Sequence, residues 1–295
     1  MTGGEGEGEG EGKGEGGRTA RGTAGREWAR HWRHEALPGL DLLRARYVSH
    51  RFPRHSHEGY LLAAVLRGAE DLGIPGGRFL IRPGDIAVLN PEVPHEARTG
   101  DPEGWAYVAL YPSLALVGAV ADEIGALRGT PAFRDAAVAD PVASALLHRV
   151  YEAADAGDAL AADSLLRTAI ARLLRANGGP MPLRAPRAAG AGAVARAREL
   201  LEERMTDPPS LERLAREVGT APFALLRAFR AAYGMPPHTW LTDARVRRAQ
   251  RLLALGERPA EVAAAVGFTD QPHLNRHFTR IVGVPPGAYR KERAG

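Results

Sequence analysis

Short apolar runs dominate residues 28–112 of the 295-residue chain. The segments LLRARYVSH, YLLAAVLRG, RFLIRPGDIAVLN and WAYVALYP follow one another, and Gly, Pro, Asn and Asp interrupt them at close intervals. Runs of this length between turn-forming residues are typical of an all-β sandwich or barrel. We therefore expect this region to form strands around one core.

The apolar pattern becomes helical from residue 113 to residue 177. The segments DPVASALLHRVYEAAD and DALAADSLLRTAIARLLRAN place Leu, Ile, Val and Ala at i, i+3, i+4 and i+7. Asp140 and Asp158 precede these segments and are predicted N-caps. The following residues 178–192, GGPMPLRAPRAAGAG, are rich in Gly and Pro and predict an interdomain linker.

The last hundred residues contain an internal repeat. The segment LERLAREVGTAPFALLRAFRAAYGMPPHTWL (211–241) matches PAEVAAAVGFTDQPHLNRHFTRIVGVPPGAYR (259–290) in its Leu, Phe, Gly and Pro-Pro positions. Each copy predicts a helix, a Gly-containing turn, a second helix and a Pro-Pro stop, which is a helix-turn-helix. The segment TWLTDARVRRAQRLLAL between the copies predicts one long amphipathic helix.

The second helix of a helix-turn-helix enters the major groove of DNA. We expect Leu225 and Phe229 in the first copy, and Leu274, Phe278 and Ile281 in the second, to form the buried stripes. Arg can bond guanine, Gln and Asn can bond adenine, and apolar side chains can contact the thymine methyl. The candidate DNA-contacting residues are therefore those outside the stripes: Phe223, Leu226, Arg227, Arg230, Gln271, Pro272, Asn275, Arg276 and Arg280.

Charge agrees with this interpretation, because residues 193–295 hold 17 Lys and Arg against 11 Asp and Glu, whereas residues 1–192 have a net charge of −2. A solvated Arg-rich surface is the alternative. The chain has no Cys, which excludes disulfides, thiolate nucleophiles and Cys-ligated zinc. The absence of long apolar runs and of a signal-peptide core leads us to expect no membrane span and a cytoplasmic location. Residues 1–25, rich in Gly and Glu, predict a disordered tail.

The segment VGFTDQPHLNRHFTRIVGVPPGAYR resembles the signature of AraC-type bacterial transcription regulators, and the resemblance spans about residues 193–292. It implies two helix-turn-helix units, joined by a rigid helix, in successive segments of the major groove. It also implies base contacts from Phe223, Leu226 and Arg227 in the first unit, and from Gln271, Pro272 and Arg276 in the second. Leu226 and Pro272 stand where this family commonly has polar residues.

The segments RFPRHSHEGYLLAAVLRG and RPGDIAVLNPEVPHEA resemble the cupin barrel that serves as the sensor half of many such regulators. Residues two apart on a strand point to one face, so His55 and His57 are expected inside the barrel with His95 opposite. We expect His55, His57, Tyr60 and His95 to line an effector site, with a structural role for the histidines as the alternative. Cupin enzymes hold a metal with such histidines and a Glu, but Leu61 stands at the position where that Glu is sought. Three imidazoles could ligate zinc or iron, yet we expect neither metal nor another cofactor.

These patterns predict a multidomain, non-enzymatic transcription regulator. An all-β cupin-like barrel with flanking helices (26–177) and a linker (178–192) precede an all-α double helix-turn-helix domain (193–295). The expected partners are double-stranded promoter DNA, a small-molecule effector, a second copy of the chain in a homodimer, and RNA polymerase. One alternative is a metal-dependent cupin enzyme fused to a DNA-binding domain, which bound metal with turnover would favour. Another is an effector-independent DNA-binding protein, which the absence of a pocket would favour.

Overall fold

The structure, a computed structural model, describes residues 27–125, 129–181 and 191–293. The predicted disordered tail lies outside these residues, as do positions 182–190 of the predicted linker. The first part of the chain is β-structure, as predicted for residues 28–112. Its strands are β1 (Trp28–Arg33), β2 (Leu40–Tyr47), β3 (Arg51–His55), β4 (Leu61–Gly68), β5 (Glu70–Ile74), β6 (Gly77–Ile81), β7 (Asp85–Leu89), β8 (His95–Thr99) and β9 (Trp105–Pro112).

These strands form two antiparallel sheets that face each other. The larger sheet has the order β1-β2-β9-β4-β7-β11, with β11 at Ala137–Ala139, and the smaller has the order β3-β8-β5-β6. Their facing surfaces share one core, to which the larger sheet contributes Leu43 and Tyr107 and the smaller contributes Leu72 and Ile81. The predicted cupin-like barrel is therefore a two-sheet structure, and hydrogen bonds between the described strands do not join the sheets into a ring.

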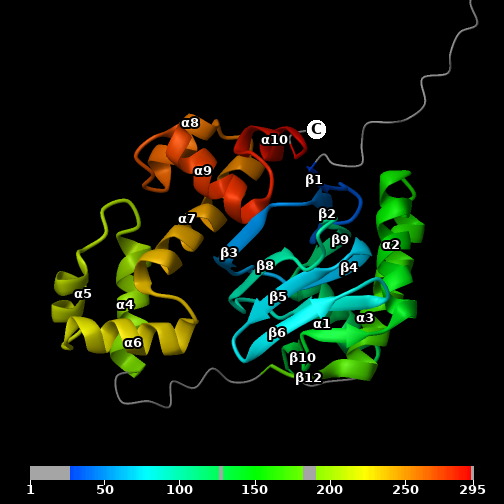
Figure 1. Cartoon of the computed structure of the whole chain (residues 1–295), viewed down its shortest axis with the longest axis horizontal. Helices are drawn as coiled ribbons and strands as arrows, with labels where there is room; N and C mark the ends of the chain where they lie inside the picture. The colour runs from blue at the N-terminus through cyan, green and yellow to red at the C-terminus, as the bar shows by residue number, and fades with distance from the viewer. Residues whose placement is uncertain (1–26, 126–128, 182–190, 294–295) are drawn as a thin grey trace, which may run out of the picture.

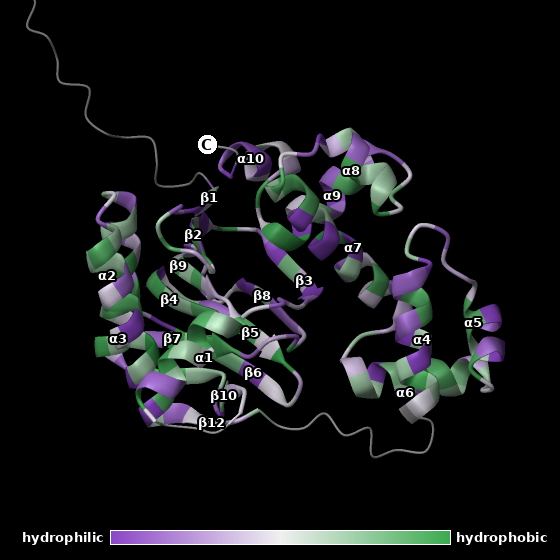
Figure 2. Cartoon of the chain, turned by 180° about the vertical axis from the view of Figure 1, so that it is seen from behind, coloured by the Kyte–Doolittle hydropathy of each residue, from purple (hydrophilic) through white to green (hydrophobic). Residues whose placement is uncertain are grey.

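Helices cover the outer face of the larger sheet (Figures 1 and 2). They are α1 (Leu114–Glu123), α2 (Pro141–Asp155) and α3 (Ala159–Asn177), as the apolar periodicity predicts. Leu62 and Leu110 of the sheet are fully buried against this layer together with Leu147 and Ile170 of the helices. The two predicted N-caps are confirmed, because Asp140 and Asp158 each accept a backbone N–H of the first helical turn at 3.0 Å.

A short sheet closes the sensor domain. Strand β10 (Pro131–Phe133) pairs with β12 (Gly178–Pro180). The first residues of the predicted linker are therefore part of the folded sensor domain. The Gly and Pro residues predict that the helix ends there. They do not indicate that the next residues form a strand that pairs with β10.

The remaining helices form two lobes joined by the long α7 (Figure 1). They are α4 (Ala191–Glu203), α5 (Leu211–Glu217), α6 (Pro222–Tyr233), α7 (Pro237–Ala254), α8 (Pro259–Ala265), α9 (Gln271–Val282) and α10 (Pro286–Lys291). Phe229 lies at the centre of one lobe and Phe278 at the centre of the other, each fully buried. The two predicted helix-turn-helix units are α5–α6 and α8–α9. No helix in the described part of the chain is long and apolar enough to cross a membrane.

Candidate effector cavity and DNA-binding surfaces

Helix α9 divides into a buried and an exposed face, as its sequence predicts. Asp270 caps its N-terminus by accepting the backbone N–H of His273 at 2.7 Å. Leu274 and Phe278 are fully buried, and Ile281 is nearly so. The candidate DNA-contacting residues Gln271, Pro272, Arg276 and Arg280 are exposed. The N-terminal half of this helix, which reaches base edges in a helix-turn-helix, is therefore accessible.

Asn275 and the C-terminal end of α9 differ from the predicted exposed face. Asn275 is half-buried, and its Oδ1 lies in the interior with no hydrogen-bond partner among the described residues. Arg280 is exposed, but its backbone lies against the His50 ring of the sensor domain. The exposed face of α9 therefore centres on Gln271, Pro272 and Arg276, whereas Asn275 presents only part of its side chain.

Helix α6 has the same division. Leu225 and Phe229 are buried, whereas Phe223 is 77% exposed and Arg227 and Arg230 also face solvent. Leu226 is half-buried. Phe223, Arg227 and Arg230 therefore lie on the exposed face of α6, and Leu226 lies at its edge.

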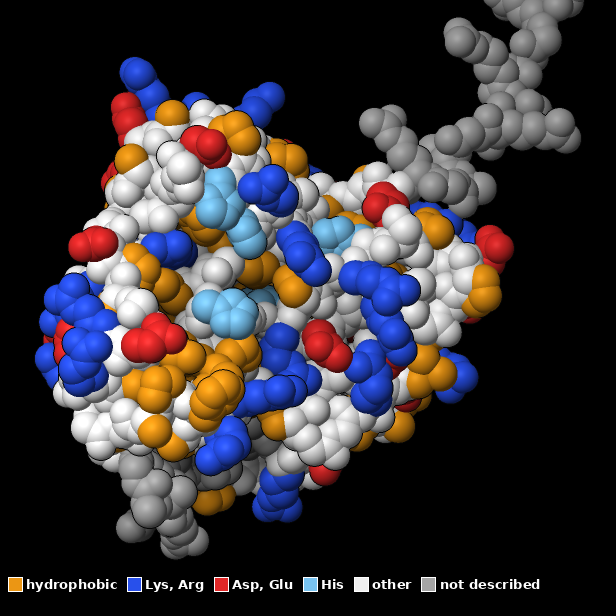
Figure 3. Space-filling view, turned by 60° about the vertical axis from the view of Figure 1, so that its left-hand side comes forward, with side chains coloured by type: hydrophobic (Ala, Val, Ile, Leu, Met, Phe, Trp, Pro, Cys, Tyr) orange, Lys and Arg blue, Asp and Glu red, His pale blue; other side chains and the backbone are white. Residues whose placement is uncertain are grey.

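The exposed arginines of α6 and α9 have no carboxylate partner among the described residues. Many other arginines do, for example Arg204 with Glu217 at 2.9 Å and Arg196 with Glu199 at 3.1 Å. Figure 3 shows Lys and Arg side chains interspersed with hydrophobic and His side chains over one side of the molecule. Unpaired guanidinium groups on exposed helices are suited to phosphate and base contacts.

The three predicted histidines lie close together. His55 ends β3 and His95 begins β8, and the two are paired across the smaller sheet. His57 is in the segment between β3 and β4. The His55 and His95 ring centroids lie 4.3 Å apart, and His57 lies 5.0 Å from each. The convergence expected from their spacing is therefore present.

Backbone contacts orient two of these rings. The Nδ1 of His55 lies 2.7 Å from the carbonyl oxygen of Pro53, and that of His95 lies 3.0 Å from the carbonyl of Val93. Burial lowers the pKa of His55 and holds the pKa values of His57 and His95 well below the usual range. Neutral rings with Nδ1–H donated to carbonyls present the Nε2 lone pairs of His55 and His95 as acceptors.

These nitrogens could also serve as metal ligands. One nitrogen from each of His55, His57 and His95 lies within 4.8 Å of the others. The carboxylate that completes such a set in cupin enzymes is missing from this position, because Leu61 is buried in the core between the sheets. The described residues thus supply three nitrogen donors and no fourth ligand of that kind.

A cavity of about 570 Å³ opens from the histidines toward the helices of the C-terminal domain. Its wall includes His31, Asp41, Phe52, His55, His57, Glu70, His95, Tyr107 and Tyr111 of the sensor domain, and Arg247, Gln250, Arg251, Leu255, Ile281, Val282 and Tyr289 of the C-terminal domain. Its volume is in the range of small-molecule sites. The absence of a pocket would have favoured an effector-independent DNA-binding protein. The presence of this cavity argues against that alternative.

The prediction that Tyr60 lines the effector site needs correction. It is fully buried on the other side of the larger sheet, where it packs against Phe133 and its hydroxyl donates to the carbonyl oxygen of Pro131. Tyr60 therefore lies outside the cavity wall. The chain bends between His57 and Tyr60 and directs the Tyr60 ring into the helical layer.

Most residues of the wall were not predicted from the sequence, among them Tyr107, Tyr111 and Glu70. Tyr107 and Tyr111 lie on one face of β9, and the apolar alternation of WAYVALYP could have indicated that face. Glu70 begins β5, is only 7% exposed, and has an Oε2 without a hydrogen-bond partner among the described residues. Burial, followed by the nearby Asp71 charge, raises the pKa of Glu70 to about 7.

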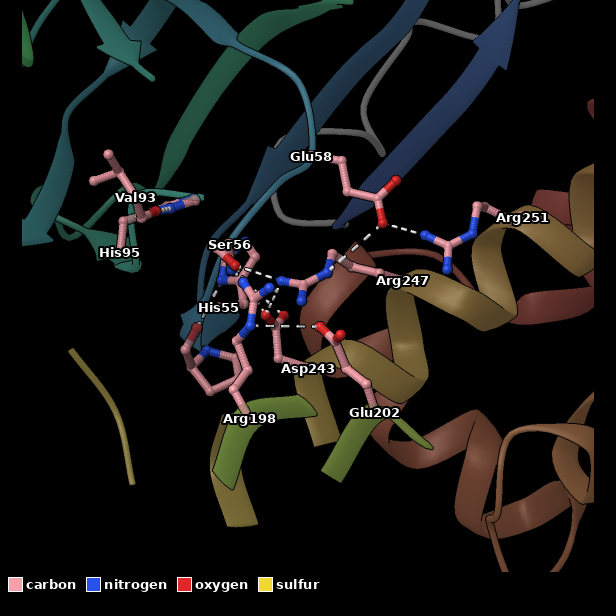
Figure 4. Close-up of polar contacts among 11 residues, drawn as sticks. His55, Ser56, Glu58, Val93, His95, Arg198, Glu202, Asp243, Arg247 and Arg251 are labelled. Atoms are coloured by element: carbon pink, nitrogen blue, oxygen red, sulfur yellow. Dashed lines mark hydrogen bonds and ion pairs between the residues drawn. The ribbon is translucent and has the colours of Figure 1, made fainter. Parts of the chain in front are cut away.

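The cavity lies beside a polar contact between the domains (Figure 4). The carboxylate of Asp243 on α7 is buried and accepts the Ser56 hydroxyl at 2.9 Å. Arg247, one turn further along α7, donates to both the Ser56 hydroxyl and Asp243. Arg251 pairs with Glu58 at the next turn. Helix α7 is thus bound to the same segment that carries His55 and His57.

A second contact joins the C-terminal lobe to the sensor sheets. The Tyr47 hydroxyl donates to the carbonyl oxygen of Gly283 at the end of α9, at 3.2 Å. Beyond α10, Arg293 pairs with Asp41 at 2.8 Å, while Tyr289 packs on the buried ring of His31. Both helix-turn-helix units also touch the sensor, because Arg54 donates to the carbonyl of Gly234 after α6.

Two family models match the chain. Residues 37–170 match the AraC-like ligand binding domain, and residues 214–292 match a helix-turn-helix domain. The HTH-type transcriptional regulator YbfI of Bacillus subtilis (strain 168) is 24% identical over 80% of this chain and 86% of its own length. The arabinose operon regulatory protein of Escherichia coli (strain K12) is 26% identical over 79% of this chain and 80% of its own length.

The solved structures support the same architecture. ToxT from Vibrio cholerae covers 88% of this chain with a TM-score of 0.54 at 12% sequence identity, and the match spans the whole ToxT chain. That likeness concerns the fold, whereas the two matched domains and the relatives concern the family. An AraC-like ligand-binding domain followed by a double helix-turn-helix assigns the chain to the AraC-type transcription regulators.

Proposed function

We propose that the interdomain cavity is the effector site of this regulator and that its occupancy changes how the two helix-turn-helix units are held. The observation that carries this proposal is the composition of the wall, in which sensor residues such as His57 face Arg251 and Ile281 of the DNA-binding domain. A ligand that contacts both domains has different affinities for different domain arrangements. That difference is what allows a ligand to shift a conformational equilibrium.

A protein of similar fold is consistent with a small organic effector. One solved ToxT structure, with a TM-score of 0.50 at 12% sequence identity, is described as bound to an unsaturated fatty acid. The present cavity, at about 570 Å³, has room for a molecule of moderate size. We propose His55, His57 and His95 as effector-binding residues and leave Tyr60 out of that group.

The DNA contacts proposed here follow the exposed faces. Arg227 and Arg230 on α6, and Gln271 and Arg276 on α9, would face bases or phosphates of double-stranded promoter DNA. Phe223, Leu226 and Pro272 would provide apolar contacts, Asn275 would contribute in part, and Arg280 would lie at the edge nearest the sensor.

A ligand screen followed by DNA titration tests the proposal. Compounds that raise the melting temperature of the full chain are selected, and the affinity for operator DNA is then measured with and without each compound. His57→Ala and His95→Ala should lose the response to the compound while keeping basal DNA binding. His148→Ala, at a half-buried position of α2 outside the cavity wall, is the matched control and should respond like the wild type. An unchanged response in both cavity variants would show that the effector binds elsewhere.

We also propose that the chain acts as a homodimer and contacts RNA polymerase at promoters. Closed two-fold dimers are the commonest oligomers, and Leu160 at the start of α3 is 79% exposed. Sedimentation velocity of the wild type and of Leu160→Glu tests the dimer. A monomer at all concentrations would contradict it.

A metal-dependent cupin enzyme is the second candidate, and the spacing of the three histidine nitrogens is the observation that favours it. The buried Leu61 at the fourth ligand position argues for a regulator without catalytic activity. Metal analysis of the purified chain, combined with a test for turnover of a bound compound, separates the two.

A further inference from the structure

The cavity wall includes the buried carboxyl group of Glu70, one oxygen of which has no hydrogen-bond partner among the described residues. Glu70 is 7% exposed, and the oxygen in question is its Oε2. A buried polar atom without a partner is costly, and a bound molecule that donates a hydrogen bond removes that cost. Glu70 therefore points to a ligand that carries a donor.

The histidines add acceptors to the same cavity. The Nδ1 atoms of His55 and His95 lie at hydrogen-bond distance from backbone carbonyls, which makes them donors. Their Nε2 atoms then carry lone pairs, because a neutral imidazole has one donor and one acceptor. The sensor side of the cavity thus offers at least three acceptor groups to a ligand.

The positive groups of the wall are already paired. Arg33 binds Asp41 at 2.7 Å, Arg247 binds Asp243 at 2.5 Å, and Arg251 pairs with Glu58. A ligand carboxylate would have to displace one of these carboxylates before it could bind a guanidinium group. A positively charged ligand would meet Glu70 without breaking any of these pairs.

The remaining wall suits the organic part of such a ligand. Phe52, Tyr107 and Tyr111 provide aromatic surface in the cavity. Ammonium groups are attracted to aromatic faces and form stronger hydrogen bonds with carboxylates than neutral donors do. Burial raises the pKa of Glu70 to about 7, and a bound cation would stabilise its ionised form.

We propose that the ligand of this cavity is an organic amine, protonated at neutral pH, whose ammonium group donates to Glu70. The inference rests on the proposed function of the cavity as the effector site. It gives that effector a charge opposite to the charge of a fatty acid.

Three probes of similar size separate the possibilities: 2-phenylethylamine, 2-phenylethanol and phenylacetate. Their dissociation constants for the full chain are measured by calorimetry at neutral pH. The amine should bind at least about tenfold more tightly than the alcohol or the acid, as an additional charged hydrogen bond implies. Glu70→Gln, which keeps the shape of the side chain, should remove this preference, and the exposed Glu103→Gln should keep it.

The wild-type comparison decides the proposal even if Glu70→Gln does not fold. Tighter binding of phenylacetate or of the alcohol overturns it, as does the absence of amine binding. Binding of Zn²⁺ alone to the histidines, with no amine binding, overturns it in favour of a metal site. Operator affinity of the wild type is measured in the same samples. If the wild type binds operator DNA and phenylacetate changes that affinity, the amine inference fails but the proposed function stands. If the wild type does not bind operator DNA, the proposed function itself fails.

Discussion

Arg276 is the residue on which the predicted base recognition depends most. It is exposed, has no carboxylate partner among the described residues, and lies in the half of α9 that follows the Asp270 cap. Arg276→Ala should leave the melting temperature nearly unchanged, because exposed substitutions have small effects. It should cost about 1–3 kcal/mol of binding to the preferred operator and relax the preference at one base pair. Selection of binding sites from random DNA measures both effects.

Arg290 on α10 provides the comparison for that experiment. It lies beyond the reading helix, so Arg290→Ala should weaken binding to all sequences alike or have no effect. An unchanged sequence preference in Arg276→Ala, or an altered one in Arg290→Ala, would show that α9 does not enter the groove as proposed.

Residue-scale predictions from the sequence succeeded where periodicity or spacing fixed a direction. The helical repeat separates buried Leu274 from exposed Arg276, and the spacing of His55 and His57 predicts their convergence. The prediction that Tyr60 lines the cavity was wrong, because the bend after His57 places its ring on the other side of the larger sheet. Glu70 was missed because a single Glu before a strand does not indicate whether it faces solvent or a cavity.

The end of α9 depends on a glycine for two separate reasons. Gly283 has a φ of +84°, and a Cβ at this position would overlap the Tyr47 hydroxyl of the sensor. Gly256 has a similar φ of +90°, but a Cβ there would meet nothing within 4 Å. Gly256→Ala should therefore cost only the backbone strain of about 1–2 kcal/mol. Gly283→Ala should cost clearly more, because it also disrupts the contact between α9 and the sensor.

Thermal unfolding of the two variants measures the difference. If Gly283→Ala and Gly256→Ala lowered the melting temperature equally, the Tyr47 contact would contribute nothing to stability.

Element-scale predictions were correct for the β-structure of residues 28–112 and for helices α2, α3 and α5 to α9, because the hydrophobic period can be read from neighbouring residues. The short strands β10 and β11 lie in the region that was predicted to be helical, so that part of the prediction was wrong. The contact between α7 and the sensor was not predicted. Ser56 and Asp243 are far apart in the sequence, and a polar residue on a helix usually faces solvent. Asp243 carries no local signal that its carboxylate is buried against another domain. Strand β12 was missed for a related reason, since its partner β10 lies more than 40 residues earlier.

At the scale of the whole molecule, the basic C-terminal region should make DNA binding sensitive to salt. Residues 193–295 carry a net charge of +6, and phosphate contacts by their arginines release counterions. The logarithm of the affinity of the full chain should fall linearly with the logarithm of the salt concentration, with a slope of several units. Fluorescence anisotropy titrations at several salt concentrations measure it. A slope near zero would argue against phosphate contacts.

The buried histidines should make stability depend on pH. Burial lowers the pKa of His31 from 6.5 to about 3 and also lowers those of His55, His57 and His95. The unfolded chain then binds more protons below about pH 6.5, so stability falls as the pH decreases through that value. Glu70 has the opposite effect on stability between pH 4.5, its unfolded pKa, and about pH 7. In this range its carboxyl group holds a proton more tightly in the folded chain, so acidification stabilises the fold at this residue.

Four histidines outnumber one carboxyl group, so the melting temperature should be lower at about pH 5.5 than at about pH 7.5. His31→Phe, which keeps a ring against Tyr111, should show a smaller decrease. An increase in the wild-type melting temperature on acidification would contradict this assignment of neutral histidines.

We propose above all that the state of the interdomain cavity controls DNA binding. Substitution of a wall residue by a larger one, such as His57→Trp, fills part of the cavity without a ligand, and the same wall includes Arg251 and Ile281 of the DNA-binding domain. The most direct test is the affinity of the full-length wild type and of His57→Trp for the selected operator, with Val142→Trp, at an exposed position of α2, as a surface control. We expect His57→Trp to change the affinity by about fivefold or more, the lower range of allosteric coupling, and to leave the sequence preference unchanged. Equal affinities for a folded His57→Trp variant and the wild type would contradict the claim.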